Sequence, residues 1–266
     1  MYNFTYHQAS ELRQASDMLA KFEEAKLIAG GQTLLPTMKL RLASPANLID
    51  LNRIEGLDGI ELSGGNLVIG AMTRHAAVAD SPAVRQSIPA LAALAHLIGD
   101  PAVRHRGTIG GSVANNDPNA DYPAACLALA ATIVTTRREI AADDFFKGLF
   151  ETALADDEII TKVSFPVPKQ AAYQKFRNPA SRFALVGVFV AQRPSEVRVA
   201  VTGAGASGVF RVPKFEAALN SRFSPKSLEG LTIPADGMAS DIHGSAEYRA
   251  HLVGVLARRA VAAAGA

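Results

Sequence analysis

The sequence predicts an α+β protein built from three consecutive units. Its 266 residues are enough for a sizeable core and for more than one lobe. Short β-type apolar runs alternate with helix-type segments along the chain, and 48% apolar against 20% charged residues is typical of a globular protein. A proline-containing stretch at 166–170 marks the clearest boundary. We therefore predict units at 1–55, 56–165 and 166–266.

The first unit is predicted to be a small α/β unit. Its strands are short alternating or apolar runs, and its helix has a serine that can act as an N-cap. The predicted elements are a strand at 2–6, a helix from Ser10 to about Phe22, a strand at 27–29, a helical turn at 33–40 and a strand at 47–51.

The second unit is predicted to combine a hairpin, apolar helices and further strands. A Ser-Gly-Gly-Asn turn at 63–66 is a hairpin signal, and Pro123 suits the first turn of a helix. The predicted elements are hairpin strands at 59–62 and 67–70, a helix at 74–79 capped by Thr73, helices at 87–97 and 122–131, and strands at 132–136, 138–141 and 159–165.

The third unit is predicted to be α+β, with its strands first and its helices last. Strands are expected at 172–177, 184–192 and 197–202, and helices at 215–219 and 245–261. The last helix is amphipathic enough to bury Leu252, Val255 and Leu256 against the strands.

Charge and cysteine content exclude several classes of function. A net charge of +2 gives no case for a nucleic-acid partner or a polybasic membrane patch. No apolar run reaches about 18 residues, so we predict no transmembrane segment and a cytoplasmic location.

The single cysteine, Cys126, excludes an intrachain disulfide and a Cys-rich metal or iron–sulfur site on this chain. It lies in an Ala/Leu run and is predicted to be a buried small hydrophobe. No metal ligands are predicted.

Two glycine loops are the main candidates for a ligand site. Residues 29–36 and 107–115 each follow an apolar or basic lead, contain a Gly-Gly pair and continue with a hydroxyl residue, Thr33 or Ser112. Glycine permits positive φ and close approach of the backbone to a ligand, and successive N–H groups can bind an anion. Each loop alone is more often a tight turn. Together they suggest a pyrophosphate held from both sides.

A third glycine stretch, 203–208, competes for this role. It matches G-x-G-x-x-G and follows a predicted strand, but the residues after it are strand-like, and Pro213 precedes the next helix. A dinucleotide fingerprint must open a helix, so we predict a turn between strands here. No glycine stretch fits the P-loop pattern either.

The glycine loops carry a family resemblance that extends along essentially the whole chain. The stretches Ala29-Gly30-Gly31-Gln32-Thr33-Leu34-Leu35-Pro36 and Arg106-Gly107-Thr108-Ile109-Gly110-Gly111-Ser112 resemble the two FAD-binding loops of the xanthine oxidase class. Residues 115–123 and 241–249 continue the similarity in the same order. More closely, the chain resembles the separate FAD-binding medium subunit of bacterial molybdenum hydroxylases such as carbon monoxide dehydrogenase.

The resemblance implies a fold and a cofactor site. The first two units would be FAD-binding subdomains of the vanillyl-alcohol-oxidase-like (PCMH-type) class, and the third would be a C-terminal α+β domain beside the isoalloxazine. Ser112 stands where the family often has Asn. The implied FAD-binding residues are Ala29, Gly30, Gly31, Gln32, Thr33, Leu34, Leu35, Thr108, Gly110, Gly111, Ser112, Ala114, Asp117, Asp121, Ile160 and Lys175.

Several single residues keep two interpretations. Asp121 matches an acid that contacts an adenosine hydroxyl, but it could instead cap the helix near Pro123. Lys175 approximates a lysine near the flavin, but it could be an exposed strand residue. His75 is predicted to be a surface helix residue rather than a base. Arg249, with His243, is expected to lock the C-terminal helix. The basic run Arg104-His105-Arg106 could steer phosphates or form a solvated turn.

The resemblance also implies a division of labour between chains. This chain would have no catalytic residue for substrate oxidation. A large molybdopterin-binding subunit would oxidise substrate, and a small [2Fe–2S] subunit would pass electrons to FAD here, and from FAD to NAD⁺, oxygen or a quinone-linked acceptor. The implied assembly is a dimer of heterotrimers. The alternatives are a free-standing FAD-dependent oxidase or dehydrogenase and a structural subunit that has lost flavin; intact glycines in both loops argue against the latter.

Overall fold

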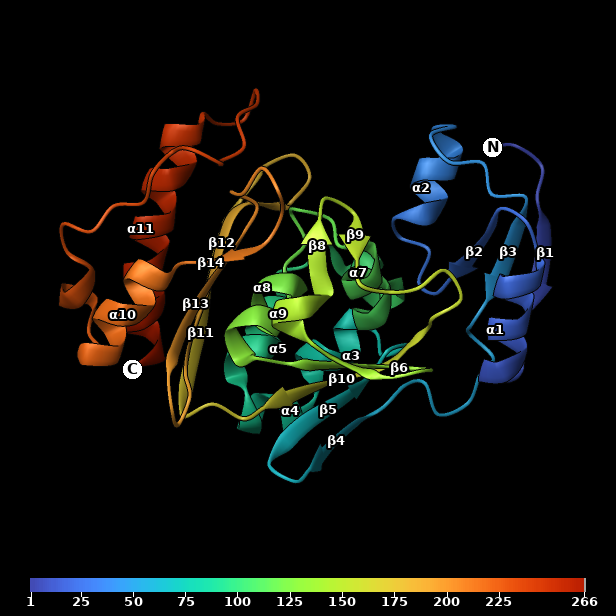
Figure 1. The fold of residues 1–266 in the computed structure, drawn as a ribbon, viewed down its shortest axis with the longest axis horizontal. Coiled ribbons are helices and arrows are strands. Elements are labelled where there is room, and N and C mark those ends of the chain that lie inside the picture. Colours follow the sequence, from blue (N-terminus) through green and yellow to red (C-terminus); the bar gives the residue numbers. More distant parts are fainter. Residues whose placement is uncertain (266) are drawn as a thin grey trace.

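Three principal sheets organise the chain, and Figure 1 shows them in three lobes that follow one another along the long axis of the molecule. The computed structural model describes residues 1–265. We call the regions around these sheets the first lobe, with strands within 5–50, the second lobe, with strands within 60–166, and the third lobe, with strands within 170–211. The chain is α+β, as predicted. The unit boundaries at 55/56 and 165/166 stay a prediction.

The first lobe is a small parallel sheet with one supporting helix. The strand order is β1-β3-β2, so the last strand in sequence is the central one. Ile49 and Ala15 are fully buried between sheet and helix. The elements are β1 (Thr5–Gln8), α1 (Leu12–Lys21), β2 (Ala25–Ile28), α2 (Leu34–Lys39) and β3 (Asn47–Asp50). The predicted helical turn at 33–40 is confirmed as α2.

The second lobe holds an antiparallel five-stranded sheet in the order β4-β5-β10-β6-β7. The predicted hairpin is confirmed, and Gly64 and Gly65 both adopt positive φ in its turn. The strands are β4 (Ile60–Ser63), β5 (Asn66–Gly70), β6 (Thr132–Thr135), β7 (Glu139–Ala141) and β10 (Ile160–Pro166), with a separate hairpin of β8 (Phe146–Gly148) and β9 (Glu151–Thr152).

Helices fill the space beside this sheet. The elements are α3 (His75–Asp80), α4 (Pro82–Ser87), α5 (Pro89–His96), α6 (Pro101–Arg106), α7 (Ile109–Asn115), α8 (Tyr122–Leu129) and α9 (Ala142–Phe145). Every residue of α8 is buried. The prediction for Cys126 is confirmed, since its side chain is fully buried and burial raises the pKa of its thiol.

The third lobe is a layered structure with a four-stranded antiparallel sheet at its centre. Alternate residues of β12 point to opposite layers: Phe189 joins the core of the second lobe, and Val188 joins the core formed with the C-terminal helices. The elements are β11 (Gln170–Arg177), β12 (Ala184–Gln192), β13 (Val197–Thr202), β14 (Phe210–Arg211), α10 (Pro213–Ser221), the 3₁₀ helix η1 (Pro225–Leu228) and α11 (Ala246–Ala264).

A buried arginine fixes the last helix on this sheet. The guanidinium of Arg249 donates to the carbonyl oxygens of Leu185 and Gly203 at 2.9 and 2.7 Å, and it pairs with Asp241 at 2.7 Å. The expected locking role of Arg249 is confirmed. The stretch 203–208 is a turn that leads into β14, so its rejection as a dinucleotide fingerprint is also confirmed.

Three local predictions are wrong. Thr73 does not cap α3, because its hydroxyl exchanges hydrogen bonds with the backbone of Gly59. The second glycine loop was not expected to be helical, yet α7 begins at Ile109, directly after Thr108. His75 was expected at the surface and is buried. In residues 1–265, no helix has both the length and the apolar character needed to span a bilayer.

Candidate functional site

The two glycine loops meet at a direct backbone contact. The first loop, residues 29–33, connects β2 to α2, and the second, residues 107–111, leads from α6 into α7. A Cβ atom on Gly30 would lie only 2.7 Å from the Cα of Gly107 and would also overlap the carbonyl oxygen of Arg106. Only glycine allows this approach. The structure therefore brings together the two loops that the sequence singled out.

The first loop presents backbone donors that have no acceptor in the chain. Within residues 1–265, the N–H groups of Gly30, Gly31, Gln32 and Thr33 make no hydrogen bond. Gly31 has a φ of +71°, which turns the chain sharply between β2 and α2. Gln32 and Thr33 are exposed. The five other predicted residues of the stretch 29–35 are partly buried: Ala29, Gly30 and Gly31 in the loop, and Leu34 and Leu35 at the start of α2. Unsatisfied donors in succession are what an anionic ligand requires.

The second loop differs, because the protein itself satisfies its N–H donors except that of Thr108. The N–H groups of Ile109 and Gly110 donate to the carbonyl oxygens of Thr73 and Ala71 at 3.1 and 2.8 Å. The N–H of Gly111 donates to the Thr108 hydroxyl at 3.2 Å, and the next N–H, of Ser112, donates to the Thr108 carbonyl. Pyrophosphate binding by amides on both sides stays a prediction, and within residues 1–265 the second loop has one N–H group without an acceptor, that of Thr108. What the second loop mainly presents to a ligand is therefore its closely packed backbone surface and its side chains.

Glycines set the shape of that surface. A Cβ on Gly110 would lie 2.6 Å from the Cβ of Ala71, so α7 can pack this closely on the second lobe only with glycine there. Gly111 is exposed and faces the first loop, since its added Cβ would lie 3.7 Å from the Cβ of Ala29. Further along α7, Ser112 is partly buried and Ala114 is exposed.

The backbone next to Ile160 is linked to the second loop by two successive hydrogen bonds through Ala71. Ile160 begins β10, and the carbonyl of the next residue, Thr161, accepts from the N–H of Ala71 at 2.9 Å. The carbonyl of Ala71 in turn accepts from Gly110. The backbone at this predicted position is therefore tied to the second loop through Ala71.

Asp121 and Lys175 bind each other at the junction of the second and third lobes. Lys175 Nζ lies 2.8 Å from one carboxylate oxygen, and the Tyr173 hydroxyl donates to the other. Burial raises the pKa of the Asp121 carboxyl, although Lys175 and Tyr173 favour its charged form. Asp121 caps no helix with its side chain, and Lys175 is not exposed. The interpretation of Asp121 as a helix cap and that of Lys175 as an exposed strand residue are therefore both wrong.

The segment 117–121 is held by the third lobe. The Thr202 hydroxyl donates to the carbonyl oxygens of Ala120 and Pro118 at 2.6 and 3.0 Å. Asp117 is partly buried, and its carboxylate accepts from the N–H of Asn119 at 2.8 Å. Burial raises the pKa of Asp117 despite that bond. The predicted positions after α7 are thus fixed from outside the second lobe.

The buried imidazole of His75 packs against the backbone of the second loop at Gly107. A Cβ on Gly107 would lie 2.6 Å from Nε2 of His75, and the ring of Tyr122 lies 5.4 Å from the His75 ring. Burial, and then the nearby Arg104, lower the pKa of His75 to about 4. His75 is therefore neutral at physiological pH. Arg104 donates to the carbonyl oxygens of Ile98 and Gly99, so its guanidinium is bound to backbone.

Two residues that the sequence analysis did not single out bind backbone at the first loop and directly before the second. Asn52 donates to the carbonyl of Ala29 in the first loop, and Arg74 donates to the carbonyl oxygens of His105 and Arg106 just before the second. A polar residue two positions after a strand, as Asn52 is after β3, is the signal that could have drawn attention to it.

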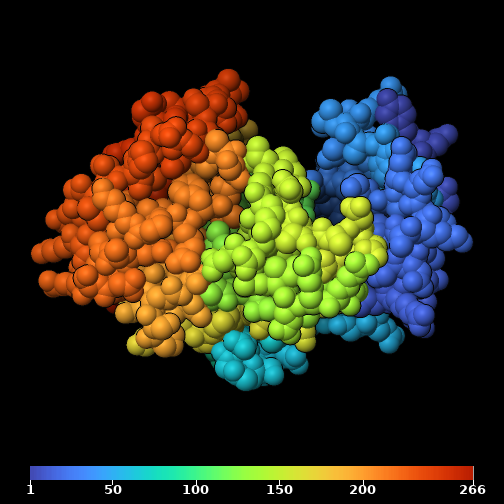
Figure 2. All heavy atoms as spheres, viewed as in Figure 1, coloured from blue at the N-terminus to red at the C-terminus, as the bar shows by residue number. Residues whose placement is uncertain are grey.

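The surface between the lobes is hollowed on the side of these loops. Figure 2 shows a notch between the part of the first lobe that carries α2 and the hairpin of β8 and β9 in the second lobe. Two other hollows lie elsewhere. One, of about 580 Å³, is lined by residues of the linker 54–61 and of β5 and β10.

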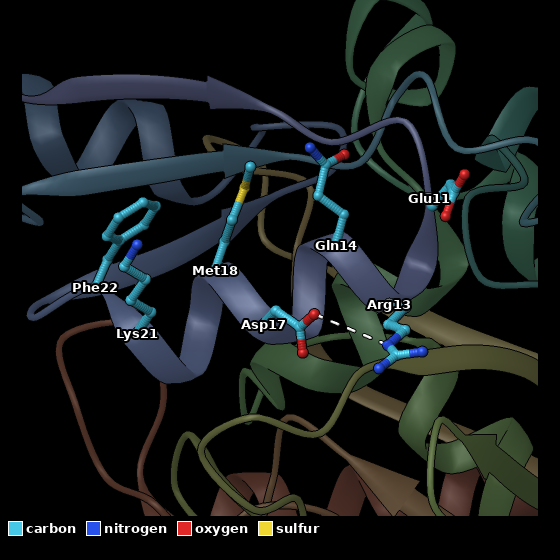
Figure 3. A pocket seen from close by; sticks show the side chains of 7 residues that line it. All are labelled: Glu11, Arg13, Gln14, Asp17, Met18, Lys21 and Phe22. Atoms are coloured by element: carbon cyan, nitrogen blue, oxygen red, sulfur yellow. Dashed lines mark ion pairs between the residues drawn. The ribbon is translucent and has the colours of Figure 1, made fainter.

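The other hollow, of about 380 Å³, runs along α1 (Figure 3). Its lining is built from side chains such as Arg13 and Asp17, which are 91% and 75% exposed and only 4.0 Å apart. Its lining includes no glycine. Long exposed side chains do not form a preorganised ligand site, so we place the candidate site at the glycine loops. Among residues 1–265, no three His, Cys, Asp or Glu side chains gather as a metal site.

Comparison with known proteins gives one family match and relatives that span the whole chain. The family model described as FAD binding domain in molybdopterin dehydrogenase matches residues 2–168. This region contains the first and second lobes and both glycine loops.

The chain is 41% identical over 275 residues to the nicotine 6-hydroxylase medium subunit of Paenarthrobacter nicotinovorans, covering 98% of this chain and 97% of the relative. It is 36% identical over 279 residues to the carbon monoxide dehydrogenase medium chain of Hydrogenophaga pseudoflava, covering 99% and 97%. Among solved structures, reconstituted CO dehydrogenase from Oligotropha carboxidovorans contains a chain that matches with a TM-score of 0.91 and 33% identity, covering 99% of this chain and 98% of that chain.

Proposed function

We infer the function from the premise that this chain belongs to the family of FAD-binding domains in molybdopterin dehydrogenase. That membership confirms the resemblance noted in the glycine loops. We propose that the chain is the FAD-binding medium subunit of a molybdenum hydroxylase complex. Electrons would reach its FAD from [2Fe–2S] clusters on a partner chain and leave to NAD⁺, oxygen or a quinone-linked acceptor.

The residues present fit FAD. Its pyrophosphate is a dianion that needs several donors at close range, and the first loop has four N–H groups in a row without acceptors in residues 1–265. The absence of a side chain at Gly30 lets the first loop lie directly against Gly107, which brings these donors up to the second loop. This pairing of free donors with a glycine-walled junction is the observation that carries the proposal.

FAD supplies the redox chemistry, because it can exchange electrons singly with iron–sulfur clusters and in pairs with an acceptor. The chain's own residues bind and orient. In this proposal residues 29–35 hold the pyrophosphate and ribityl region through backbone donors. Thr108, Gly110, Gly111, Ser112 and Ala114 form the opposite wall.

The remaining predicted positions lie after α7 and on the neighbouring strands. We propose that the segment containing Asp117 and Asp121 borders the cofactor, with the backbone of Ile160 beside the second loop. Lys175 and Asp121 are bound to each other, which makes their contribution one of fixing this border. No catalytic residue for substrate oxidation is proposed on this chain.

The finer architecture and assembly belong to the same proposal. Units 1–55 and 56–165 would be the two subdomains of a PCMH-type FAD-binding fold, with 166–266 as the C-terminal domain. The partners would be a large molybdopterin-binding subunit and a small [2Fe–2S] subunit, in a cytoplasmic dimer of heterotrimers. Relatives named as medium subunits or medium chains support this, since such names imply larger and smaller partners.

The cofactor is tested on the purified full-length chain. Absorbance and released-flavin analysis should give close to one FAD per chain, either as isolated or after reconstitution. Protein that stays colourless and ignores added FAD in a fluorescence titration would exclude the flavoprotein function and leave only a structural subunit.

The assembly is tested by affinity purification from the native host. A molybdenum-containing large chain and an iron–sulfur small chain should elute with this subunit in equal amounts. A yellow chain that elutes alone and oxidises a small substrate by itself would instead indicate a free-standing flavoprotein oxidase or dehydrogenase.

A further inference from the structure

We propose that Asn52 and Arg74 form a clasp that fixes the spacing of the two glycine loops and thereby sets the affinity for FAD. The clasp consists of these two side chains and the three backbone carbonyl groups they bind. It deepens the function proposed above and rests on it, because the affinity it controls is that for the flavin.

The contact between the loops needs such support. The backbone of Gly30 touches that of Gly107, but glycine has no side chain with which to hold this contact. The loops also belong to separate sheets, in the first and second lobes. A buried apolar cluster that includes Ile49, Met72 and Ile159 joins the two lobes. At the loops themselves, close approach without side-chain packing contributes little free energy, so a polar link beside the glycines would fix their distance.

Asn52 supports the first loop. It follows β3, and its side-chain N–H donates to the carbonyl of Ala29 at 3.0 Å. The same amide donates to a carboxylate oxygen of Asp50 at 2.6 Å, and the backbone N–H of Asn52 donates to that oxygen at 2.9 Å. The Tyr6 hydroxyl donates to the other oxygen. Asn52 is therefore held in place from the first-lobe sheet.

Arg74 supports the second loop. Its Nη1 donates to the carbonyl oxygens of His105 and Arg106, each at 3.2 Å. Its Nη2 donates to the side-chain oxygen of Asn52, also at 3.2 Å. The planar guanidinium can reach three acceptors at once, which a lysine ammonium at the end of a flexible chain does not match. Together, Asn52 and Arg74 form a continuous link from one loop to the other.

The clasp leaves the proposed ligand donors free. Near the loops it binds carbonyl oxygens only, at Ala29 in the first loop and at His105 and Arg106 at the end of α6. The N–H groups of residues 30–33 keep no acceptor in residues 1–265. A positioning role for these two residues follows, because they hold the loops without occupying the groups that would bind an anion.

The test measures FAD affinity for the full-length wild type, Arg74→Met, Arg74→Lys, Asn52→Ala and the double variant. Arg74→Met should weaken binding about tenfold, the scale of losing hydrogen bonds from a charged group. Arg74→Lys should fail to restore it, although it keeps the charge. The double variant should bind about as weakly as Arg74→Met, because both changes break one link.

Arg85→Met is the matched control. Arg85 donates to the Ala79 carbonyl at 3.0 Å and to Asp80 at 2.7 Å, so it too binds backbone and acid, but within the second lobe alone. Its removal should leave the FAD dissociation constant within about twofold. Full affinity in Arg74→Met would overturn the clasp. Full rescue by Arg74→Lys would also overturn it, since that result indicates direct attraction between charge and phosphate.

Hydrogen exchange on the flavin-free proteins separates this inference from the proposed function. Arg74→Met should speed amide exchange in peptides covering 28–35 and 104–111 together, while Arg85→Met should not. A wild type that binds no FAD would refute the proposed function, and the exchange data would still test the clasp. Unchanged exchange in both peptides would refute the clasp even if the wild type binds flavin.

Discussion

Lys175 Nζ lies 2.8 Å from a carboxylate oxygen of Asp121, and the two side chains are only 1% and 4% exposed. The pair joins β11 of the third lobe to the start of α8 in the second. The remaining bonds of the pair are to the Tyr173 hydroxyl and the Leu97 carbonyl. A buried pair of this kind fixes the relative position of two lobes.

Breaking this pair from one side should strongly destabilise the protein. Lys175→Met leaves a buried carboxylate without its cation, and Asp121→Asn leaves a buried ammonium, so each should lower the free energy of unfolding by about 3–5 kcal/mol. The double variant should lose less than the sum of the two. Urea unfolding of the four proteins measures this coupling. Asp80→Asn, which breaks an exposed pair with Arg85, is the control and should cost under about 1 kcal/mol. Additive losses would mean that the pair is not coupled.

Adding a side chain at Gly30 should weaken FAD binding. Gly30→Ala places a Cβ against the backbone of Gly107, and because backbone atoms cannot rotate away, the loops must separate. The FAD dissociation constant should rise by at least about tenfold, as expected for a misplaced set of donors. Gly254→Ala is the matched control, since its nearest atom would lie at an ordinary 3.7 Å. Equal flavin titrations for the two variants would show that the loop contact does not matter for binding.

The cap at Thr108 should stabilise α7. Its hydroxyl accepts from the N–H of Gly111, so Thr108→Val keeps the shape but leaves that donor unsatisfied. The free energy of unfolding should fall by about 1 kcal/mol, and Thr108→Ser should recover most of it. Urea unfolding with unchanged slope measures the effect. A serine variant as unstable as the valine variant would indicate that packing, rather than the cap, is responsible.

Acid should destabilise the protein through His75. Burial, and then Arg104, lower its folded-state pKa to about 4, below the unfolded value of about 6.5. The unfolded chain therefore binds more protons in this range. Stability from the neutral ring is complete above pH 6.5 and is lost as the pH falls towards 4, by up to about 3 kcal/mol.

The His75→Phe variant isolates this effect. Its unfolding free energy, measured between pH 7 and pH 4, should decline less steeply than that of the wild type. The other groups whose pKa values are shifted are common to both proteins and cancel in the difference. Parallel curves would mean that His75 does not titrate on unfolding in this range.

Most helices and strands could be predicted because their residues carry a local pattern. The hairpin around Gly64 and Gly65, the apolar helix α8 and the long strand β12 are examples. The start of α7 could not, since two adjacent glycines disfavour a helix by about 1 kcal/mol each. The Thr108 cap and the fit of Gly110 against Ala71 offset that cost, and both depend on tertiary structure.

The candidate site was only partly predictable, for a similar reason. The sequence indicated both loops, because each contains a Gly-Gly pair followed closely by a hydroxyl residue. The sequence carried no signal that Gly30 and Gly107 would touch. It also carried none that N–H groups of the second loop would donate to carbonyl oxygens of the chain, such as that of Ala71. His75 was expected at the surface as a polar residue early in a helix, but Gly107 and Tyr122 enclose its ring.

Four consecutive free N–H groups belong to the first loop, whereas in the second loop only that of Thr108 has no acceptor within residues 1–265. Retention of a ligand and integrity of the scaffold are therefore separable properties of this molecule. A few changes within the smallest lobe would be enough to empty the site, whereas the large cores of the other two lobes and their outer surfaces would be unaltered. A homologue with this same architecture can thus be a cofactor-free chain, and flavin content has to be measured for each member.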